Sequence, residues 1–360
     1  MNRSEPILQI LNNFNLQGTI NSIELYGSGH VNKTYKVTTT KSAYILQKIN
    51  STAFLDVPLL MRNFSYVTQW LQSKNTNPRS TLEVVLTKDN NPYTTDENGD
   101  YWRVLSCVTD TFCLDSVRSP SDLCNAGVAF GTFALNLSDF PIDKLGETIV
   151  DFHNTEKRIA NLRKAIDADT CNRASLVKNE IAFVDERANE ACTLVHMLEN
   201  NELPLRITHN DTKLNNILFD NTTELPLCVV DLDTVMPGLI GYDFGDAIRY
   251  AANSAAEDEI DLSKVKLSIP LYEAYCEGFI SVCRDFLTEK ELQTLPLAAK
   301  IITLETGVRF LTDYLQGDVY FSTHRPNHNL DRCRTQFALV ADMERKFDEM
   351  QLIATRYYAK

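Results

Sequence analysis

Hydrophobic and polar residues follow two different patterns along the chain. Over the first hundred residues, short β-like runs are separated by turn residues, as expected for the strands of a small sheet. From about Ser119 onward, apolar residues recur with a helical period over long stretches. The pattern predicts an α+β chain with two lobes: a small N-terminal lobe built on an antiparallel sheet, and a larger, mainly helical C-terminal lobe.

The predicted N-terminal lobe contains five strands and one helix, after an amphipathic helix at the start of the chain. The strands are expected at 19–26, 32–38, 43–49, 82–86 and 102–108, and the helix at 59–72. Long helices are expected at 121–137, 155–168, 175–200, 270–286, 289–315 and 330–358, interrupted by an Asn- and Asp-rich β-like island at 206–233. Because the sequence has no repeat and no Ser/Gly linker, we expect two lobes, 1–108 and 109–360, joined near 106–110.

Composition and charge exclude several kinds of partner. The chain has 35 basic and 48 acidic residues, a net charge of −13, whereas proteins that neutralise nucleic-acid phosphates usually carry a basic excess. No apolar run approaches the roughly 20 residues that a membrane span requires. The nine cysteines include no C-x-x-C pair, which favours free thiols over a disulfide framework or a zinc site. We therefore expect a cytoplasmic protein that binds neither nucleic acid nor membranes.

The β-like island carries the residues that phosphoryl transfer needs. Asp211 is followed five residues later by Asn216, and a hydrophobic strand then leads to Asp231 and Asp233. A kinase requires a carboxylate that accepts the proton of the acceptor hydroxyl, and oxygen ligands that hold Mg²⁺ against the nucleotide phosphates. The spacing predicts Asp211 as the base, Asn216 and Asp231 as magnesium ligands, and Asp233 as an accessory ligand or water holder.

These residues belong to segments that resemble a known family. HNDTKLNNILFD, followed by VVDLDT, is similar to the aminoglycoside phosphotransferase and choline kinase superfamily, and most similar to its N-acetylhexosamine 1-kinases. The resemblance continues in YGSGHVNKTYKVTT, PGLIGYDFGDAIRYAANSAAEDE and GVRFLTDYLQGDVYF, so it covers essentially the whole chain. It implies a bilobal, protein-kinase-like α+β fold with a nucleotide-binding N-terminal lobe. It also implies transfer of the ATP γ-phosphate to the anomeric hydroxyl of an amino sugar, with Mg²⁺.

The nucleotide contacts are expected in the N-terminal lobe. Gly27, Ser28 and Gly29 form a turn whose backbone N–H groups suit a loop that covers phosphates. Ser106 and Val108 are further expected contacts, at the exit of the last strand. Along 43–49, alternation places Lys48 and Gln47 on opposite faces, and the family's phosphate-facing position falls on Gln47 instead of a lysine. Either Lys48 turns inward or the Gln47 amide replaces the ammonium, and the sequence leaves both open.

The tripeptide Asp243-Phe244-Gly245 matches the metal-binding tripeptide of protein kinases but lies 32 residues after Asp211. Because Asp231 has the better spacing, we interpret Asp243 as a buried structural acid that ties the catalytic loop to a helix, with a ligand role as the alternative. His209 is interpreted as a support for the same loop.

The resemblance also nominates a sugar site. Its residues here are His30, Asn32, Arg309 and Tyr320, which could hydrogen-bond sugar hydroxyls and an acetamide and offer an aromatic face. For Arg309 the alternative is an i,i+4 ion pair with Asp313, and for Tyr320 it is ordinary core packing.

The leading hypothesis is an ATP- and Mg²⁺-dependent 1-kinase of N-acetylglucosamine or N-acetylgalactosamine. The sequence does not choose between these epimers, between ATP and GTP, or between oligomeric states. A kinase of choline, an aminoglycoside or homoserine is the nearest alternative, although the mixed His, Asn, Arg and Tyr set favours a neutral polyol. A catalytically silent pseudokinase and a helical interaction module are the other hypotheses.

Overall fold

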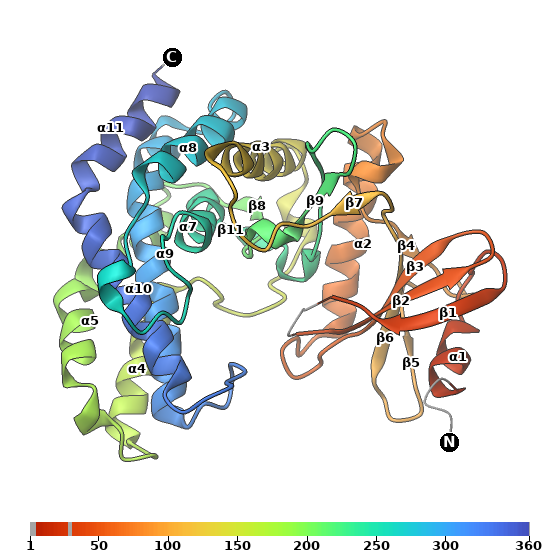
Figure 1. Cartoon of the computed structure of the whole chain (residues 1–360), viewed down its shortest axis with the longest axis horizontal. Coiled ribbons are helices and arrows are strands. Elements are labelled where there is room, and N and C mark those ends of the chain that lie inside the picture. The colour runs from red at the N-terminus through yellow and green to blue at the C-terminus, as the bar shows by residue number, and fades with distance from the viewer. Residues whose placement is uncertain (1–4, 28–30, 360) are drawn as a thin grey trace. The chain divides into compact units, whose positions relative to one another are not determined.

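The computed structural model describes residues 5–27 and 31–359, and their contacts divide the chain into two compact units (Figure 1). The first unit comprises Met1–Phe112, Asp139–Val150 and Leu218–Met236, and the second comprises Cys113–Ser138, Asp151–Ile217 and Pro237–Lys360. The antiparallel sheet and the helical region confirm the predicted fold class. The roles expected for lobes 1–108 and 109–360 stay predictions.

The first unit is built on an antiparallel sheet of six strands. They are β1 (Ile20–Leu25), β2 (Lys33–Thr39), β3 (Ala43–Lys48), β4 (Val84–Val85), β5 (Thr94–Thr95) and β6 (Tyr101–Ser106). Their order is β1-β2-β3-β6-β4, and the short β5, absent from the prediction, pairs with β6. In this register Leu46 lies opposite Val104, and Gln47 lies opposite Arg103.

A helix covers each face of this sheet. On one face α1 (Glu5–Leu11) contributes Ile10 and Leu11 to a core with Leu46 and Val104, which confirms the expected amphipathic opening helix. Because side chains alternate along a strand, Gln47 and Arg103 face the other way, where Met61 and other residues of α2 (Val57–Lys74) lie. A side-chain cap by Asp56 begins α2.

A second, smaller sheet and the remaining loops complete the first unit. This sheet has the order β10-β9-β7, formed by Pro226–Val229, Ile217–Asp220 and Thr111–Phe112. Single turns of 3₁₀ helix lie at Pro78–Ser80 (η1), Ile142–Lys144 (η2) and Leu232–Thr234 (η5). Asn63 of α2 donates to the carbonyl oxygens of Gly146 and Val235, which ties the segment around η5 to this helix.

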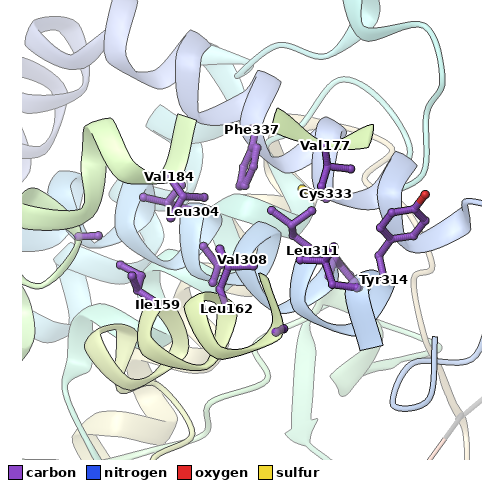
Figure 2. Packing of buried hydrophobic residues seen from close by; sticks show 14 of the residues in the cluster. Ile159, Leu162, Val177, Val184, Leu304, Val308, Leu311, Tyr314, Cys333 and Phe337 are labelled. Carbon is purple, nitrogen blue, oxygen red and sulfur yellow. The ribbon is translucent and has the colours of Figure 1, made fainter. Parts of the chain in front are cut away.

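The second unit consists mainly of helices around one long central helix. They are α3 (Pro120–Asn136), α4 (Thr155–Ala168), α5 (Lys178–Ala191), α6 (Thr193–Glu199), α7 (Ile240–Ala251), α8 (Ile269–Cys283), α9 (Glu289–Gln316), α10 (His328–Arg345) and α11 (Phe347–Tyr358). Single turns of 3₁₀ helix occur at Ala174–Leu176, Leu214–Asn216 and Leu262–Lys264, and β8 (Arg206–Thr208) pairs with β11 (Met236–Gly238). Leu304, Val308 and Leu311 of α9 pack against α4, α5 and α10 (Figure 2). A capping box of Thr288 and Glu291 begins α9.

The helices differ from the prediction at three places. The helix expected at 175–200 is two helices that meet at Cys192, and the one expected at 330–358 is two that meet at Lys346. At this break the Lys346 ammonium donates to Asp342 of α10 and to the carbonyl of Leu267, which lies outside the helix. The third difference is α7, which was not among the expected helices. In the described part of the chain, no helix is both long and apolar enough to cross a membrane.

Candidate active site

The catalytic loop of the second unit, residues 209–216, is held by carboxylates from α7. The two oxygens of Asp243 accept the backbone N–H groups of His209 and Asn210 at 2.8 and 2.7 Å. Asp246 accepts the N–H of Thr212 at 2.9 Å. Asp243 is only 1% exposed, and burial raises its pKa to about 6, even though these N–H groups favour the charged form. The interpretation of Asp243 as a buried structural acid is therefore confirmed.

The buried side chain of His209 supports the catalytic loop. Its ring is completely buried, and Phe130 and Phe133 of α3 meet it edge-on at centroid distances of 5.6 Å. Its Nδ1 accepts the backbone N–H of Asp211 at 3.3 Å. This arrangement confirms the expected supporting role and fixes the start of the segment that carries Asp211.

Asp211 is held in its ionised form by two neighbours. The Lys213 ammonium lies 2.8 Å from Oδ1, and the Asn216 amide nitrogen donates to Oδ2 at 3.0 Å and to the Asp211 carbonyl at 2.8 Å. Burial raises the pKa of Asp211, but the charge of Lys213 and these hydrogen bonds outweigh it, so the net pKa lies below the usual value. At neutral pH the carboxylate is thus a hydrogen-bond acceptor, which is the form a base requires.

In the first unit, Asp231 and Asp233 flank the start of η5. Asp231 has φ 60° and ψ 54°, a left-handed conformation that Asp tolerates better than most residues. Asp233 is 3% exposed, and both of its carboxylate oxygens have partners. Oδ1 lies 2.5 Å from Nη1 of Arg103, and Oδ2 accepts from the Asn32 amide at 2.6 Å. Its predicted role as an accessory ligand must compete with these bonds.

The two candidate phosphate contacts on β3 have different surroundings. Lys48 forms an ion pair with Asp100. Gln47 accepts from Nε of Arg103 at 2.9 Å and donates to Thr34 at 3.2 Å. Arg103, which sequence patterns did not predict as a functional residue, is therefore the buried cation on the Gln47 face. The only signal in the sequence is one charged residue inside the strand YWRVLS.

The remaining predicted nucleotide residues lie in the first unit or outside the described part. Gly27 has φ 78°, which suits a glycine turn. Ser28, Gly29 and His30 lie outside the described residues. Ser106 donates to Glu83 at 2.8 Å, and the Val108 carbonyl accepts from Thr111 at 3.1 Å. The nucleotide-binding roles of these residues stay predictions.

Arg309 and Tyr320, both in the second unit, contact aromatic rings and share Phe321 as a neighbour. The Arg309 guanidinium lies over the rings of Phe152 and Phe321, at 4.9 and 5.5 Å, and the Tyr320 ring meets Phe321 edge-on. Tyr320 is 60% exposed, so core packing does not explain it. Asp313 is buried and accepts the backbone N–H groups of residues 319–321, so its charge serves that segment and not an exposed pair with Arg309.

The donor atoms of the loop are compatible with magnesium. Because the Asn216 amide nitrogen donates to Asp211, its oxygen is the atom left for a cation, and amide and carboxylate oxygens are the ligands that Mg²⁺ prefers. Among residues 5–27 and 31–359, no group of three or more His, Cys, Asp or Glu side chains is placed to hold a metal. Mg²⁺ usually takes one or two protein carboxylates and completes its coordination with phosphate and water oxygens.

Comparisons with solved structures agree on the fold. An aminoglycoside phosphotransferase from Alicyclobacillus acidocaldarius subsp. acidocaldarius DSM 446 is 15% identical with a TM-score of 0.66, covering 98% of this chain and 96% of its own. A microcompartment-associated aminopropanol kinase is 15% identical with a TM-score of 0.60, covering 96% and 98%. A choline kinase, LicA from Streptococcus pneumoniae, is 12% identical with a TM-score of 0.52, covering 95% and 98%.

The sequence itself gives the family. Residues 22–277, which include the glycine turn, Asp211, Asn216 and Asp231, match the phosphotransferase enzyme family (APH). This match spans more than half of the chain and contains both the held loop of the second unit and the η5 segment of the first. The chain belongs to the APH phosphotransferase enzyme family.

Proposed function

We propose that this phosphotransferase is an ATP- and Mg²⁺-dependent kinase that phosphorylates the anomeric hydroxyl of an N-acetylhexosamine. The observation that carries the proposal is the state of Asp211: an ionised carboxylate, bonded to Lys213 and Asn216, on a loop whose backbone is fixed by Asp243 and Asp246. A carboxylate held this rigidly suits general-base chemistry, in which the position of the base matters as much as its basicity.

In the proposed reaction, Asp211 orients the sugar hydroxyl by accepting its hydrogen bond. The acceptor oxygen forms a bond to the γ-phosphorus, while the bond from that phosphorus to the β,γ-bridging oxygen breaks and ADP leaves. The hydroxyl proton passes to Asp211 as the new bond forms. Since the pKa of Asp211 is low, proton transfer comes late, when the attacking oxygen has lost most of its basicity to phosphorus.

Asn216 and Asp231 are the proposed magnesium ligands. Magnesium, when bound, neutralises charge on the β- and γ-phosphates and holds them in line with the acceptor. Gly27 and the turn after it, with Gln47, Lys48, Ser106 and Val108, remain the proposed nucleotide contacts.

Arg309 and Tyr320 are the proposed sugar contacts in the second unit, and His30 and Asn32 in the first. A second arginine close to Arg309 affects which charge the acceptor molecule can carry. Arg158 donates to the Phe152 carbonyl at 3.1 and 2.6 Å, and burial together with the charge of Arg309 lowers its pKa. Two neighbouring guanidinium groups disfavour a cationic acceptor such as choline or an aminoglycoside. They suit hydroxyl and carbonyl oxygens.

Purified protein should be incubated with Mg-ATP and a panel of N-acetylglucosamine, N-acetylgalactosamine, glucose, choline, homoserine and kanamycin, with ADP release measured for each. The proposal expects release with an N-acetylhexosamine and a product whose phosphate is stable to alkali and labile to acid. A phosphate stable to mild acid would place it on another hydroxyl.

An amino-alcohol kinase is the second candidate, because two of the structural relatives act as aminopropanol and choline kinases. Release with choline alone would replace the sugar by that class of acceptor and leave the roles of Asp211, Asn216 and Asp231 in place. Silence with every acceptor would favour a pseudokinase.

A further inference from the structure

The first unit contains a buried ion pair where protein kinases have a different one. In protein kinases a lysine of the third strand pairs with a glutamate of the helix that follows, and both must be in place for activity. Here the strand position is Gln47, and α2, the helix that follows β3, contains no Asp or Glu. Both partners of that pair are therefore absent, and the buried cation is Arg103 of β6.

Arg103 contacts three elements of the first unit at once. Its Nε donates to Gln47 on β3, and its Nη1 lies 2.5 Å from Asp233 in η5. From α2, the Phe64 ring lies 4.4 Å from the guanidinium carbon, and the Met61 sulfur lies 3.8 Å from Nη1. With 1% exposure, the guanidinium is enclosed by these groups. A planar cation with several fixed donors is the side chain best able to join elements in this way.

The segment that carries Asp231 is fixed through Asp233. Besides Arg103, Asp233 is bonded by the Asn32 amide at 2.6 Å, and its carbonyl oxygen accepts from Thr148 at 3.0 Å. The Asn32 oxygen in turn accepts the backbone N–H of Asn50 at 3.0 Å. Asp231 lies two residues before Asp233, in a left-handed conformation that the surrounding bonds must maintain.

We propose that Arg103 is a positioning residue that replaces the strand-lysine and helix-glutamate pair, and that Asp233 is its counter-ion and not an accessory magnesium ligand. Arg103 acts through Asp233 on the backbone that presents Asp231. The inference rests on the proposed function, because it takes Asp231 as a magnesium ligand. A direct phosphate contact is excluded by the enclosure of the guanidinium.

The test is the binding of ADP by the full chain, measured by calorimetry with and without Mg²⁺. In Arg103→Met, metal-free ADP should bind within twofold of wild type, whereas the strengthening of ADP binding by Mg²⁺ should fall at least tenfold. The Mg²⁺ concentration for half-maximal turnover should rise in parallel. If Asp233 is itself a ligand, removing Arg103 frees its carboxylate, and the strengthening by Mg²⁺ is kept or increased; that result overturns the inference.

Further variants cover the case in which Arg103→Met does not fold. Arg103→Lys keeps the charge but has no fork to join Gln47 and Asp233. In Arg103→Lys, the strengthening of ADP binding by Mg²⁺ should be three- to tenfold smaller than in wild type. The double variant Arg103→Met/Asp233→Leu removes both buried charges. If Arg103→Lys or the double variant folds and Mg²⁺ strengthens its ADP binding as much as in wild type, the inference is contradicted.

Arg79→Met is the matched control, because Arg79 and Asp220 form another Arg–Asp pair in the first unit, at 2.9 Å. It should leave the strengthening of ADP binding by Mg²⁺ unchanged. An equal loss in Arg79→Met would show that any lost ion pair has this effect and would overturn the inference.

These measurements need no acceptor, so they succeed or fail separately from the sugar assays. A wild-type chain that phosphorylates no hexosamine still reports on Arg103 through ADP binding. A wild-type chain whose ADP affinity ignores Mg²⁺ overturns the inference whatever the sugar assays show.

Discussion

Each unit anchors one proposed functional acid through a second, buried carboxylate, but the two anchors are built differently. In the second unit Asp243 holds the loop of Asp211 by accepting two backbone N–H groups. In the first unit Asp233 holds the segment of Asp231 through two side chains, the cation Arg103 and the amide Asn32. The loop is therefore fixed at its backbone, whereas the segment depends on the identity of particular side chains.

The difference has a consequence for charge. The Arg103 guanidinium lies 2.5 Å from Asp233, so an adjacent cation balances the negative charge of that carboxylate. Asp243 accepts two backbone N–H groups, and burial raises its pKa to about 6 although the charges of His209 and His153 lower it. We therefore expect the anchor of the catalytic loop to respond to pH and the anchor of the Asp231 segment to respond to mutation of its partner.

The largest expected effect comes from removing the proposed base, Asp211, while both anchors stay intact. Asp211→Asn should lower kcat by about 10³-fold, within the range that general-base catalysis contributes. The melting temperature should fall only by the loss of the ion pair with Lys213, because Asn216 can still donate to the amide oxygen. Initial rates of ADP release with the best acceptor, together with thermal unfolding, measure both. Turnover within tenfold of wild type would mean that Asp211 is not the base.

Breaking the backbone anchor should cost stability. In Asp243→Asn one amide oxygen replaces two carboxylate oxygens, so one of the N–H groups of His209 and Asn210 loses its acceptor. An unsatisfied buried group costs about 1–3 kcal/mol. Chemical denaturation at pH 4.5, where the buried negative charge of Asp243 does not offset this loss, would measure the difference in the free energy of unfolding.

The cost of Asp243→Asn should also depend on pH. The folded pKa of Asp243, about 6, lies above its ordinary value of 3.8, so the folded wild type binds more protons than the unfolded chain between these values. The contribution of this group to stability is thus fully present below pH 3.8 and is lost as the pH rises to about 6, by up to roughly 3 kcal/mol. The variant should therefore lose more stability at pH 4.5 than at pH 7. Asp285→Asn, at a 92% exposed side chain, should show no such trend.

Removing Lys213, the cation beside the proposed base Asp211, should shift the titration of that carboxyl. Lys213 and the hydrogen bonds to Asp211 lower the pKa of that carboxyl against the effect of burial. In Lys213→Met the pKa should rise, so the acid limb of kcat/KM should move to higher pH, with a loss at neutral pH of about tenfold or less. A profile of kcat/KM from pH 4.5 to 8 would show the movement. An unmoved limb would mean that another group controls it.

The same contrast explains what the sequence could predict. Asp211, Asn216 and Asp231 could be nominated from the sequence because their spacing along the chain is short and is set by one loop and the two strands β9 and β10. Asp243 was found because it follows the loop in a segment of known spacing. In each case local geometry carries the information.

Contacts that depend on tertiary structure were not predicted. Arg103 meets Asp233 across 130 positions, and only the pairing of β3 with β6 places it beside Gln47. The helix α7 was not predicted although Asp243, Asp246 and Arg249 recur at helical spacing, because these polar side chains are buried and do not mark a solvent-exposed face. At the break the Lys346 ammonium bonds the carbonyl of Leu267 in another segment, a contact that periodicity cannot show.

The smallest expected effects come from two matched threonines, one in each unit. Thr148 donates to the carbonyl oxygen of Asp233 at 3.0 Å, and Thr212 donates to that of Asp243 at 2.6 Å. Both are buried, so replacement by valine removes one hydrogen bond and keeps the shape, at a cost of about 1 kcal/mol in the free energy of unfolding for each.

The effects of the two threonine substitutions on function should nevertheless differ. Because Thr148 supports the Asp231 segment, Thr148→Val should raise the Mg²⁺ requirement with kcat at saturating Mg²⁺ nearly unchanged. Because Thr212 supports the catalytic loop, Thr212→Val should lower kcat and leave the Mg²⁺ requirement alone. Titrating Mg²⁺ in both variants measures the split, and equal shifts in both quantities would mean that the two anchors do not serve separate functions.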